Sequence, residues 1–239
     1  MIFSEDIKKA SVIHIPHSSK FIPNFTGYNI DLIEKELELL TDHDTDVLFN
    51  VKNVQKIKAN FSRIFCDVER LPDNEEEMFK FGRGFFYTHT DSGLQLRTEE
   101  LKKEVYKKFY LKHHNKFTNT VTKKLKKHGF CFILDGHSFN DIPFNTDLNK
   151  EPQRPQICIG VDEFHTPKFL IDYTVNFFKN NGFEIKINSP YSGTIIPLKY
   201  YKKEKNVFGI MIEVNKNVYL NNTKKSQDFK NLMNDYFEF

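Results

Sequence analysis

A short apolar run stops abruptly in the stretch Ile13-His14-Ile15-Pro16-His17-Ser18-Ser19. The run begins at Ser11 and predicts a buried strand, which the proline ends. A second stretch of the same kind, Asp135-Gly136-His137-Ser138, follows the apolar run 130–134 much further along the chain. Because ligands of open α/β sheets gather at the carboxyl ends of strands, the two stretches together predict a metal site.

The rest of the chain alternates between strand-like and helix-like patterns. Apolar runs bounded by Gly, Pro, Asn or Asp predict further strands at 64–68, 156–159, 184–187 and 207–214. Apolar residues at helical spacing predict helices at 29–50, 98–127 and 168–180, and a capping helix in the tail after Asn215. Strands that alternate with helices are typical of an α/β sandwich. Stretches with neither pattern predict long functional loops at 71–97 and 139–155.

Composition predicts one folded domain over residues 1–239. The chain is 39% hydrophobic and 15% aromatic, which is enough to bury a sizeable core. Its net charge of +3 results from 35 basic and 32 acidic residues, so the charge balance calls for neither a nucleic acid nor a membrane partner. The lysine-rich segment 123–127 lies on a predicted amphipathic helix without interleaved aromatic residues, a pattern that does not favour RNA binding.

Cysteine usage and the lengths of the apolar runs predict a cytoplasmic location. The three cysteines lie far apart, and two of them sit inside apolar runs, where small buried thiols are common. The sequence has no apolar run near 18 residues and no charged-then-apolar leader. We therefore expect neither a membrane span nor a signal peptide.

Three groups of residues are candidate metal ligands. They are the pair His14 and His17, the acidic cluster Asp42-His43-Asp44-Thr45-Asp46, and Asp135 with His137. Hydrolytic zinc sites commonly take three protein ligands from His and carboxylate and leave the fourth position to water, and these groups supply such a set. For His14, the competing interpretation is a hydrogen-bonded histidine at a strand end.

The acidic cluster also allows two other interpretations. Its three aspartates match the first ligands of an EF-hand loop, but the sixth and twelfth positions hold Val47 and Asn53 instead of Gly and Glu. Calcium binding is therefore not favoured. A solvated helix face stays open as the alternative to a metal ligand.

Arginine and glutamate add candidates for binding and catalysis. Arg63 and Arg70, two of only five arginines, bracket a predicted strand and are suited to bidentate capture of a carboxylate, which indicates an anionic substrate. The competing interpretation is a surface ion pair with Asp67 or Glu69, which would contribute little. Glu213 ends an apolar run and is a candidate general base beside a metal ion, with a structural acid as the alternative.

These segments, taken in order, resemble the N-formylglutamate amidohydrolase family over roughly residues 11 to 220. The resemblance is carried by an ordered set of short motifs. They are Ile15-Pro16-His17-Ser18, Thr41-Asp42 with Asp46, Ser62-Arg63 with Asp67 and Arg70, Gly84 before Tyr87, His114, Asp135-Gly136-His137-Ser138-Phe139, Ile157-Cys158-Ile159-Gly160, Asn188-Ser189-Pro190-Tyr191, and Ile212-Glu213-Val214-Asn215 with Tyr219.

The resemblance implies a fold and an activity. The fold would be a three-layer α/β/α sandwich on a mixed sheet, like that of zinc-dependent exopeptidases (the phosphorylase/hydrolase-like fold). The activity would be zinc-dependent hydrolysis of the acyl amide bond of a small anionic N-acyl amino acid, with N-formyl-L-glutamate as the default substrate. The metal ligands would be His17, Asp42 and His137, with Asp46 in reserve.

The resemblance also implies roles for the remaining candidates. Glu213 would be the base that deprotonates zinc-bound water. Arg63 and Arg70 would hold the substrate carboxylate or the developing oxyanion. Asn188 and Tyr191 would contribute to substrate binding.

Four positions depart from the family pattern, namely Ser19, Glu69, Thr194 and Lys216, where the family has Gly, Asn, Gly and Arg. Glu69 is expected to weaken the capture of a diacid by the neighbouring arginines and to shift preference toward another N-acyl compound. Two further functions stay open. One is a peptidase or amidase that acts on peptidoglycan-like fragments, and the other is a non-catalytic relative that binds an anionic ligand.

Overall fold

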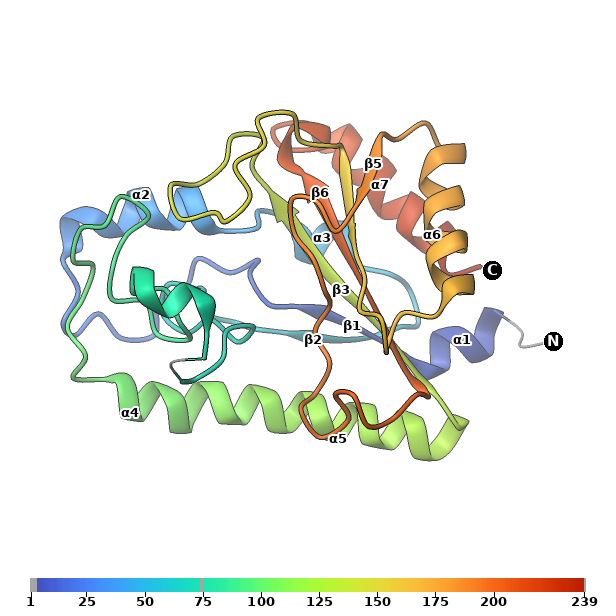
Figure 1. Cartoon of the computed structure of the whole chain (residues 1–239), viewed down its shortest axis with the longest axis horizontal. Coiled ribbons are helices and arrows are strands. Elements are labelled where there is room, and N and C mark those ends of the chain that lie inside the picture. The colour runs from blue at the N-terminus through green and yellow to red at the C-terminus, as the bar shows by residue number, and fades with distance from the viewer. Residues whose placement is uncertain (1–3, 74, 239) are drawn as a thin grey trace.

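Six strands form one mixed sheet in the computed structural model, which describes residues 4–73 and 75–238 (Figure 1). They lie in the spatial order β2-β1-β3-β6-β4-β5. Their bounds are β1 Ser11–Ile15, β2 Gln55–Lys58, β3 Cys131–Phe139, β4 Ile157–Gly160, β5 Ile185–Ile187 and β6 Val207–Asn215. Strands β1, β2, β3 and β6 are parallel, whereas β4 and β5 run in the opposite direction. The carboxyl ends of β1, β3 and β6 therefore share one edge of the sheet.

Helices cover both faces of this sheet and make the three layers that the sequence predicts (Figure 1). Val12 of β1 and Ile133 of β3 pack in a core cluster with helix α5 (Leu111–His128). Ile13 and Leu134 point to the other face and pack in a second cluster with helices α6 (Lys168–Asn180) and α7 (Thr223–Tyr236). This alternation follows from the two-residue period of a strand. The helices are α1 Ser4–Ala10, α2 Ile30–Leu40, α3 Thr45–Leu48, α4 Lys102–Val105, α5 Leu111–His128, α6 Lys168–Asn180 and α7 Thr223–Tyr236, with short helical turns at Glu77–Phe81, Tyr106–Tyr110 and Lys216–Val218. None of the helices in the described ranges is long and apolar enough to cross a membrane.

The predicted strand at 64–68 is wrong. These residues are buried, but the N–H groups of Phe65 and Cys66 both donate to the carbonyl of Ser62, which closes turns instead of a ladder. The apolar pattern there reflects burial in the core and not strand pairing. Strand β2 escaped prediction because only Ile57 of its four residues is buried, so no apolar run marks it.

The predicted helix at 29–50 is interrupted between α2 and α3. Asp44 adopts a left-handed conformation with φ of 58°, and the hydroxyl of Thr45 donates to the carbonyl of Asp42 at 2.9 Å. The N–H of Asp42 donates instead to the carbonyl of His17, at 3.0 Å. The interruption thus ties Asp42 to the loop that follows β1. The predicted helix at 98–127 is also modified, because it begins at Lys102 and contains the π-helical turn Tyr106–Tyr110.

The two predicted long loops are confirmed as irregular segments, apart from the short helical turn Glu77–Phe81. The first loop is fastened by Arg97, whose side chain is buried. Its guanidinium donates to the carbonyl of Tyr87 and to the carbonyl of Phe65, each at 2.7 Å. These bonds hold the loop against the turn at residues 62–67, which carries Arg63 and Asp67 into the site.

Candidate metal and catalytic site

The candidate residues meet at the carboxyl edge of the parallel strands. His14 lies in β1, and His17 follows two residues after its end. Asp135 and His137 lie in β3, where His137 is paired in register with Glu213 of the neighbouring strand β6. Because parallel strands end at the same edge, segments far apart in the sequence deliver these side chains to one place.

His17, Asp42 and His137 form a buried group whose ligand atoms all lie within 4.8 Å of one another. Asp42 Oδ2 is 3.0 Å from Nδ1 of His137 and 3.6 Å from Nδ1 of His17. Burial would raise the pKa of Asp42, but His137 and His17 beside it lower that pKa below its usual range. The reserve ligand Asp46 is not brought to this group, because it pairs with Lys58 at 2.8 Å and its side chain is 37% exposed.

The three side chains fit a zinc ion. Zinc binds His nitrogen and carboxylate oxygen at about 2.0–2.2 Å, which places neighbouring ligand atoms about 2.8–3.1 Å apart at octahedral angles and about 3.3–3.6 Å apart at tetrahedral angles. The observed separations of 3.0 and 3.6 Å fall in these ranges. In addition, Nδ1 of His17 is buried and has no hydrogen-bond partner among the described residues. A buried lone pair of this kind is costly unless something binds it.

Asp67 orients His17 from behind. It lies 2.9 Å from Nε2 of His17, an arrangement typical of the carboxylate that fixes a metal-binding histidine. Asp67 also accepts hydrogen bonds from Arg63 at 3.0 and 3.2 Å and from the hydroxyl of Tyr87 at 2.7 Å. Burial would raise the pKa of Asp67, but His17 and Arg63 hold it well below its usual range. The Arg63–Asp67 pair is therefore real, but it is buried and not on the surface.

Positive charge surrounds the group. Nη1 of Arg63 lies 3.8 Å from Asp42 Oδ1. Arg70 is one-third exposed, with its guanidinium 3.4 Å from Glu76. Lys216 is buried, and its ammonium lies 3.5 Å from the carbonyl of Leu39. Burial lowers the pKa of Lys216 against the attraction of Asp42. A carboxylate group of a ligand would find cations on this side of the site.

Glu213 has the character of a group that exchanges a proton near neutral pH. It is buried, and its Oε2 has no hydrogen-bond partner in the described part of the chain. Burial raises its pKa to about 8, although the nearby His137 opposes the shift. A carboxylate whose pKa is raised toward neutrality can accept and return a proton at physiological pH.

Glu69 lies against two histidines and not against Arg63 and Arg70, the arginines whose binding of a diacid it was expected to weaken. Its Oε2 is 3.1 Å from Nε2 of His137, and its Oε1 is 3.5 Å from Nδ1 of His14. The expected weakening of the arginines by this carboxylate is therefore not supported by the contacts. This position of Glu69 was not predictable from the sequence, because it depends on the turns that replace the predicted strand at 64–68.

His14 is a buried, hydrogen-bonded histidine at a strand end, as one of the two interpretations predicted. Its Nδ1 is 3.0 Å from Asp135 Oδ1, and its Nε2 is 2.9 Å from Nε2 of His113 in α5. Burial lowers the pKa of His113 to about 2, so its neutral ring can accept the proton of His14. Sequence reasoning missed His113 because its position in a helix predicted only a helix face.

Tyr191 and Asn188, the two predicted substrate-binding residues, bond to different parts of the protein. Tyr191 bonds through its hydroxyl to Asp147, at 3.1 and 3.2 Å, and stacks edge-on against Phe139. Asn188 follows β5, which runs opposite to β6, and its carboxamide oxygen accepts from the N–H of Val161 at 2.8 Å.

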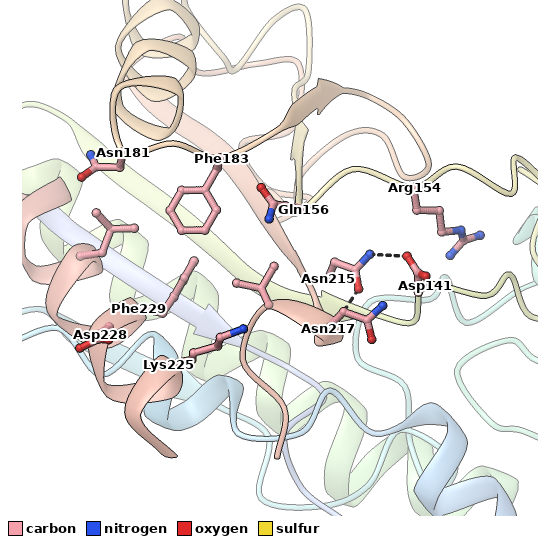
Figure 2. Close-up of a pocket in the computed structure, with 12 residues that line it drawn as sticks. Asp141, Arg154, Gln156, Asn181, Phe183, Asn215, Asn217, Lys225, Asp228 and Phe229 are labelled. Atoms are coloured by element: carbon pink, nitrogen blue, oxygen red, sulfur yellow. Dashed lines mark hydrogen bonds between the residues drawn. The ribbon is translucent and has the colours of Figure 1, made fainter. Parts of the chain in front are cut away.

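A pocket of about 560 Å³ lies beside the site and not in it (Figure 2). Phe183 and Phe229 line it in edge-to-face contact, with ring centroids 6.1 Å apart, and Asn215 donates to Asp141 at 2.9 Å near its other end. None of the candidate metal ligands lines it. Arg154, which does, is occupied by bonds to Asp147, Tyr191 and backbone carbonyls.

Comparison with known proteins adds a family and a fold. A family model described as N-formylglutamate amidohydrolase matches residues 10–220. No curated protein matches the chain. The crystal structure of N-formylglutamate amidohydrolase from Ralstonia eutropha JMP134 is similar, with a TM-score of 0.83 and 18% identity over 96% of this chain and 93% of that one. A gene product of Agrobacterium tumefaciens is also similar, with a TM-score of 0.67 and 15% identity over 98% of this chain and 91% of that one.

Proposed function

This chain belongs to the N-formylglutamate amidohydrolase family, and from that premise we propose that it is a zinc-dependent amidohydrolase of small N-acyl amino acids. The default substrate is N-formyl-L-glutamate. Hydrolysis breaks the amide C–N bond, transfers the oxygen of water to the formyl carbon, and protonates the departing nitrogen, which yields formate and glutamate.

One observation carries the proposal. Three segments of the chain that lie far apart in sequence deliver His17, Asp42 and His137 to one buried group, and strand register sets Glu213 beside His137. Two histidines and one carboxylate with a free fourth position are the usual ligand set of catalytic zinc. When bound there, zinc would act as a Lewis acid toward water and toward the amide carbonyl.

The remaining residues have separate tasks in this scheme. Glu213 accepts a proton at its carboxylate and returns it to the leaving nitrogen, a use that suits its raised pKa. Asp67 holds the ring of His17 in one orientation. Arg63, Arg70 and Lys216 attract the substrate carboxylates to the side of the site on which positive charge is concentrated.

The test is the release of free glutamate from N-formyl-L-glutamate by zinc-loaded protein, with a chelator-treated sample as control. Other N-formyl and N-acetyl amino acids and short peptidoglycan-like peptides are assayed alongside. We expect chelator-sensitive release with a preference for an N-acyl amino acid. His137→Ala should abolish both activity and zinc retention, whereas His128→Ala, at the far end of α5, should keep both.

The other outcomes are distinct. Turnover only of the peptides would assign the peptidase function instead. Zinc retention with no turnover of any substrate would assign a binding protein. Full activity of the His137→Ala variant would refute the site itself.

A further inference from the structure

A second group of side chains beside the first has the same spacing as the proposed zinc ligands. His14, Glu69 and Asp135 offer ligand atoms that all lie within 4.8 Å of one another. Nδ1 of His14 is 3.0 Å from Asp135 Oδ1 and 3.5 Å from Glu69 Oε1. The corresponding separations around Asp42 are 3.0 and 3.6 Å. Both groups therefore match the distances between neighbouring ligands of one divalent ion, about 2.8–3.6 Å for bonds of about 2.0–2.2 Å.

The polar atoms around this second group are satisfied only in part. Nδ1 of His14 is hydrogen-bonded to Asp135 Oδ1, and Asp135 Oδ2 accepts from the N–H of Ile195 at 3.2 Å. Glu69 Oε1, in contrast, is buried and has no hydrogen-bond partner among the described residues. Nε2 of His137 also lacks one within the described ranges, although its side chain is only 4% exposed and it points at Glu69 Oε2 and Asp135 Oδ1, 3.1 and 3.2 Å away. Two buried polar atoms without a hydrogen bond are costly unless something binds them.

The charge of the group also calls for a cation. Glu69 and Asp135 are two carboxylates with ligand atoms within 4.8 Å. The only ion pairs recorded for them in the described part of the chain are with histidines. Asp67, in contrast, has Arg63 within 3.0 Å. Two neighbouring carboxylates in a buried place repel each other strongly unless a cation lies between them.

The outer contacts of His14 suit a metal ligand as well. Its second nitrogen, Nε2, is 2.9 Å from Nε2 of His113. Metal-binding histidines almost always engage their other ring nitrogen in a hydrogen bond, which fixes the ring and its tautomer. His14 thus has one nitrogen anchored on α5 and the other directed at the two carboxylates.

We propose that His14, Glu69 and Asp135 bind a second divalent metal ion, next to the one held by His17, Asp42 and His137. Its class is a first-row transition ion that accepts mixed imidazole and carboxylate ligands, such as Zn²⁺ or Mn²⁺. The ring of His137 lies between the two positions, with Nδ1 toward Asp42 and Nε2 toward Glu69. The inference rests on the proposed function only for the first ion.

Glu69 supplies one of the two carboxylates of this group. Glu69→Asn is therefore the informative substitution, because a neutral amide would supply neither the charge nor the second carboxylate. Glu69→Gln is a second variant that keeps the length of the side chain. Glu163→Asn, in an exposed turn, is the matched control.

The experiment measures bound metal directly. Chelator-treated protein is incubated with excess Zn²⁺, and separately with Mn²⁺, and is then desalted and analysed by inductively coupled plasma mass spectrometry. We expect two ions per chain for the original sequence and for Glu163→Asn, and one ion per chain for Glu69→Asn and Glu69→Gln. Circular dichroism melting establishes that each variant is folded.

The results that overturn the proposal differ from those that overturn the proposed function. One ion per chain in the original sequence, removed by His137→Ala, would refute the second position and leave the first intact. Two ions retained in both Glu69 variants would refute Glu69 as a ligand and the proposal with it. Absence of any bound ion would refute both sites.

Discussion

Removal of the charge of Asp67 should destabilise the protein and loosen the metal site together. Asp67 is fully buried and accepts bonds from His17, Arg63 and Tyr87. Asp67→Asn keeps the shape but removes the nearest counter-charge of the largely buried guanidinium of Arg63 and leaves only Asp42, 3.8 Å away, which costs about 3–5 kcal/mol. In a chain of this length that corresponds to a fall in melting temperature of about 6–20 °C. The affinity for zinc should fall about 10–100-fold, because His17 loses its orienting partner.

Two matched variants provide reference values for the loss in the free energy of unfolding. Tyr87→Phe removes one hydroxyl bond to the same carboxylate and should cost about 1.5–3 kcal/mol. Asp172→Asn removes an exposed pair with Lys168 on α6 and should cost less than about 1 kcal/mol. The assay is urea unfolding of chelator-treated protein, so that metal binding does not contribute to the measured free energy.

The pH dependence gives a second check on the same reasoning. The pKa of Asp67 is depressed in the folded protein, so its stabilisation is fully present above the unfolded pKa of about 3.9 and is lost as the pH falls toward the folded value. The difference between the original sequence and Asp67→Asn should therefore be constant above about pH 5 and should shrink below about pH 4. A difference below about 1 kcal/mol at pH 7, or one that persists unchanged in acid, would refute the reasoning.

Four further substitutions test the site and its surroundings. Asp42→Asn should abolish zinc retention, as measured by metal analysis, whereas Asp46→Asn should not; the reverse pattern would exchange their roles. Gly136→Ala should cost about 1–3 kcal/mol in urea unfolding, because the added methyl would lie 2.7 Å from the buried ring of Phe49; an unchanged midpoint would contradict this. Glu213→Gln should lower kcat about 10²–10⁴-fold. The same variant should raise the melting temperature of metal-free protein at pH 7. Burial raises the pKa of Glu213 to about 8 in the folded protein, so at pH 7 the unfolded chain, in which the pKa is about 4.3, gains stability from ionisation that the folded state does not, and glutamine removes this difference. A variant with normal kcat would remove Glu213 from the proposed catalytic role.

The parts of the fold that were predictable are those in which burial and periodicity coincide. β1 and α6 have the predicted bounds. The apolar run of β1 ends at a proline, and the helical pattern of α6 begins directly after one. The turns at 64–68 were not predictable, because burial in a loop gives the same apolar run as a strand. β2 was not predictable because it lies at the sheet edge and only Ile57 of its four residues is buried, so no apolar run marks it.

The candidate site shows the same division. His17 and His137 could be placed at strand ends from sequence, and the acidic cluster was a candidate as a whole, within which the family resemblance selected Asp42. The position of Asp42 depends on the left-handed residue Asp44, which ends the regular helix and has no clear signal in an acidic cluster. The contacts of Glu69 and His113 could not be predicted, because they arise only when a turn and a helix pack against β1 and β3.

The order of the strands in the sheet has a consequence for synthesis of the protein. β6 is the last strand to leave the ribosome, yet it lies in the interior of the sheet between β3 and β4. Until β6 emerges, β4 and β5 have no strand that joins them to β1, β2 and β3, and His137 lacks the neighbour that carries Glu213. Distant strand pairings form slowly, and Glu213 joins His137 only when β6 pairs with β3. His17, Asp42 and His137 come from segments that precede β6, so Glu213 is expected to reach this group after its other members.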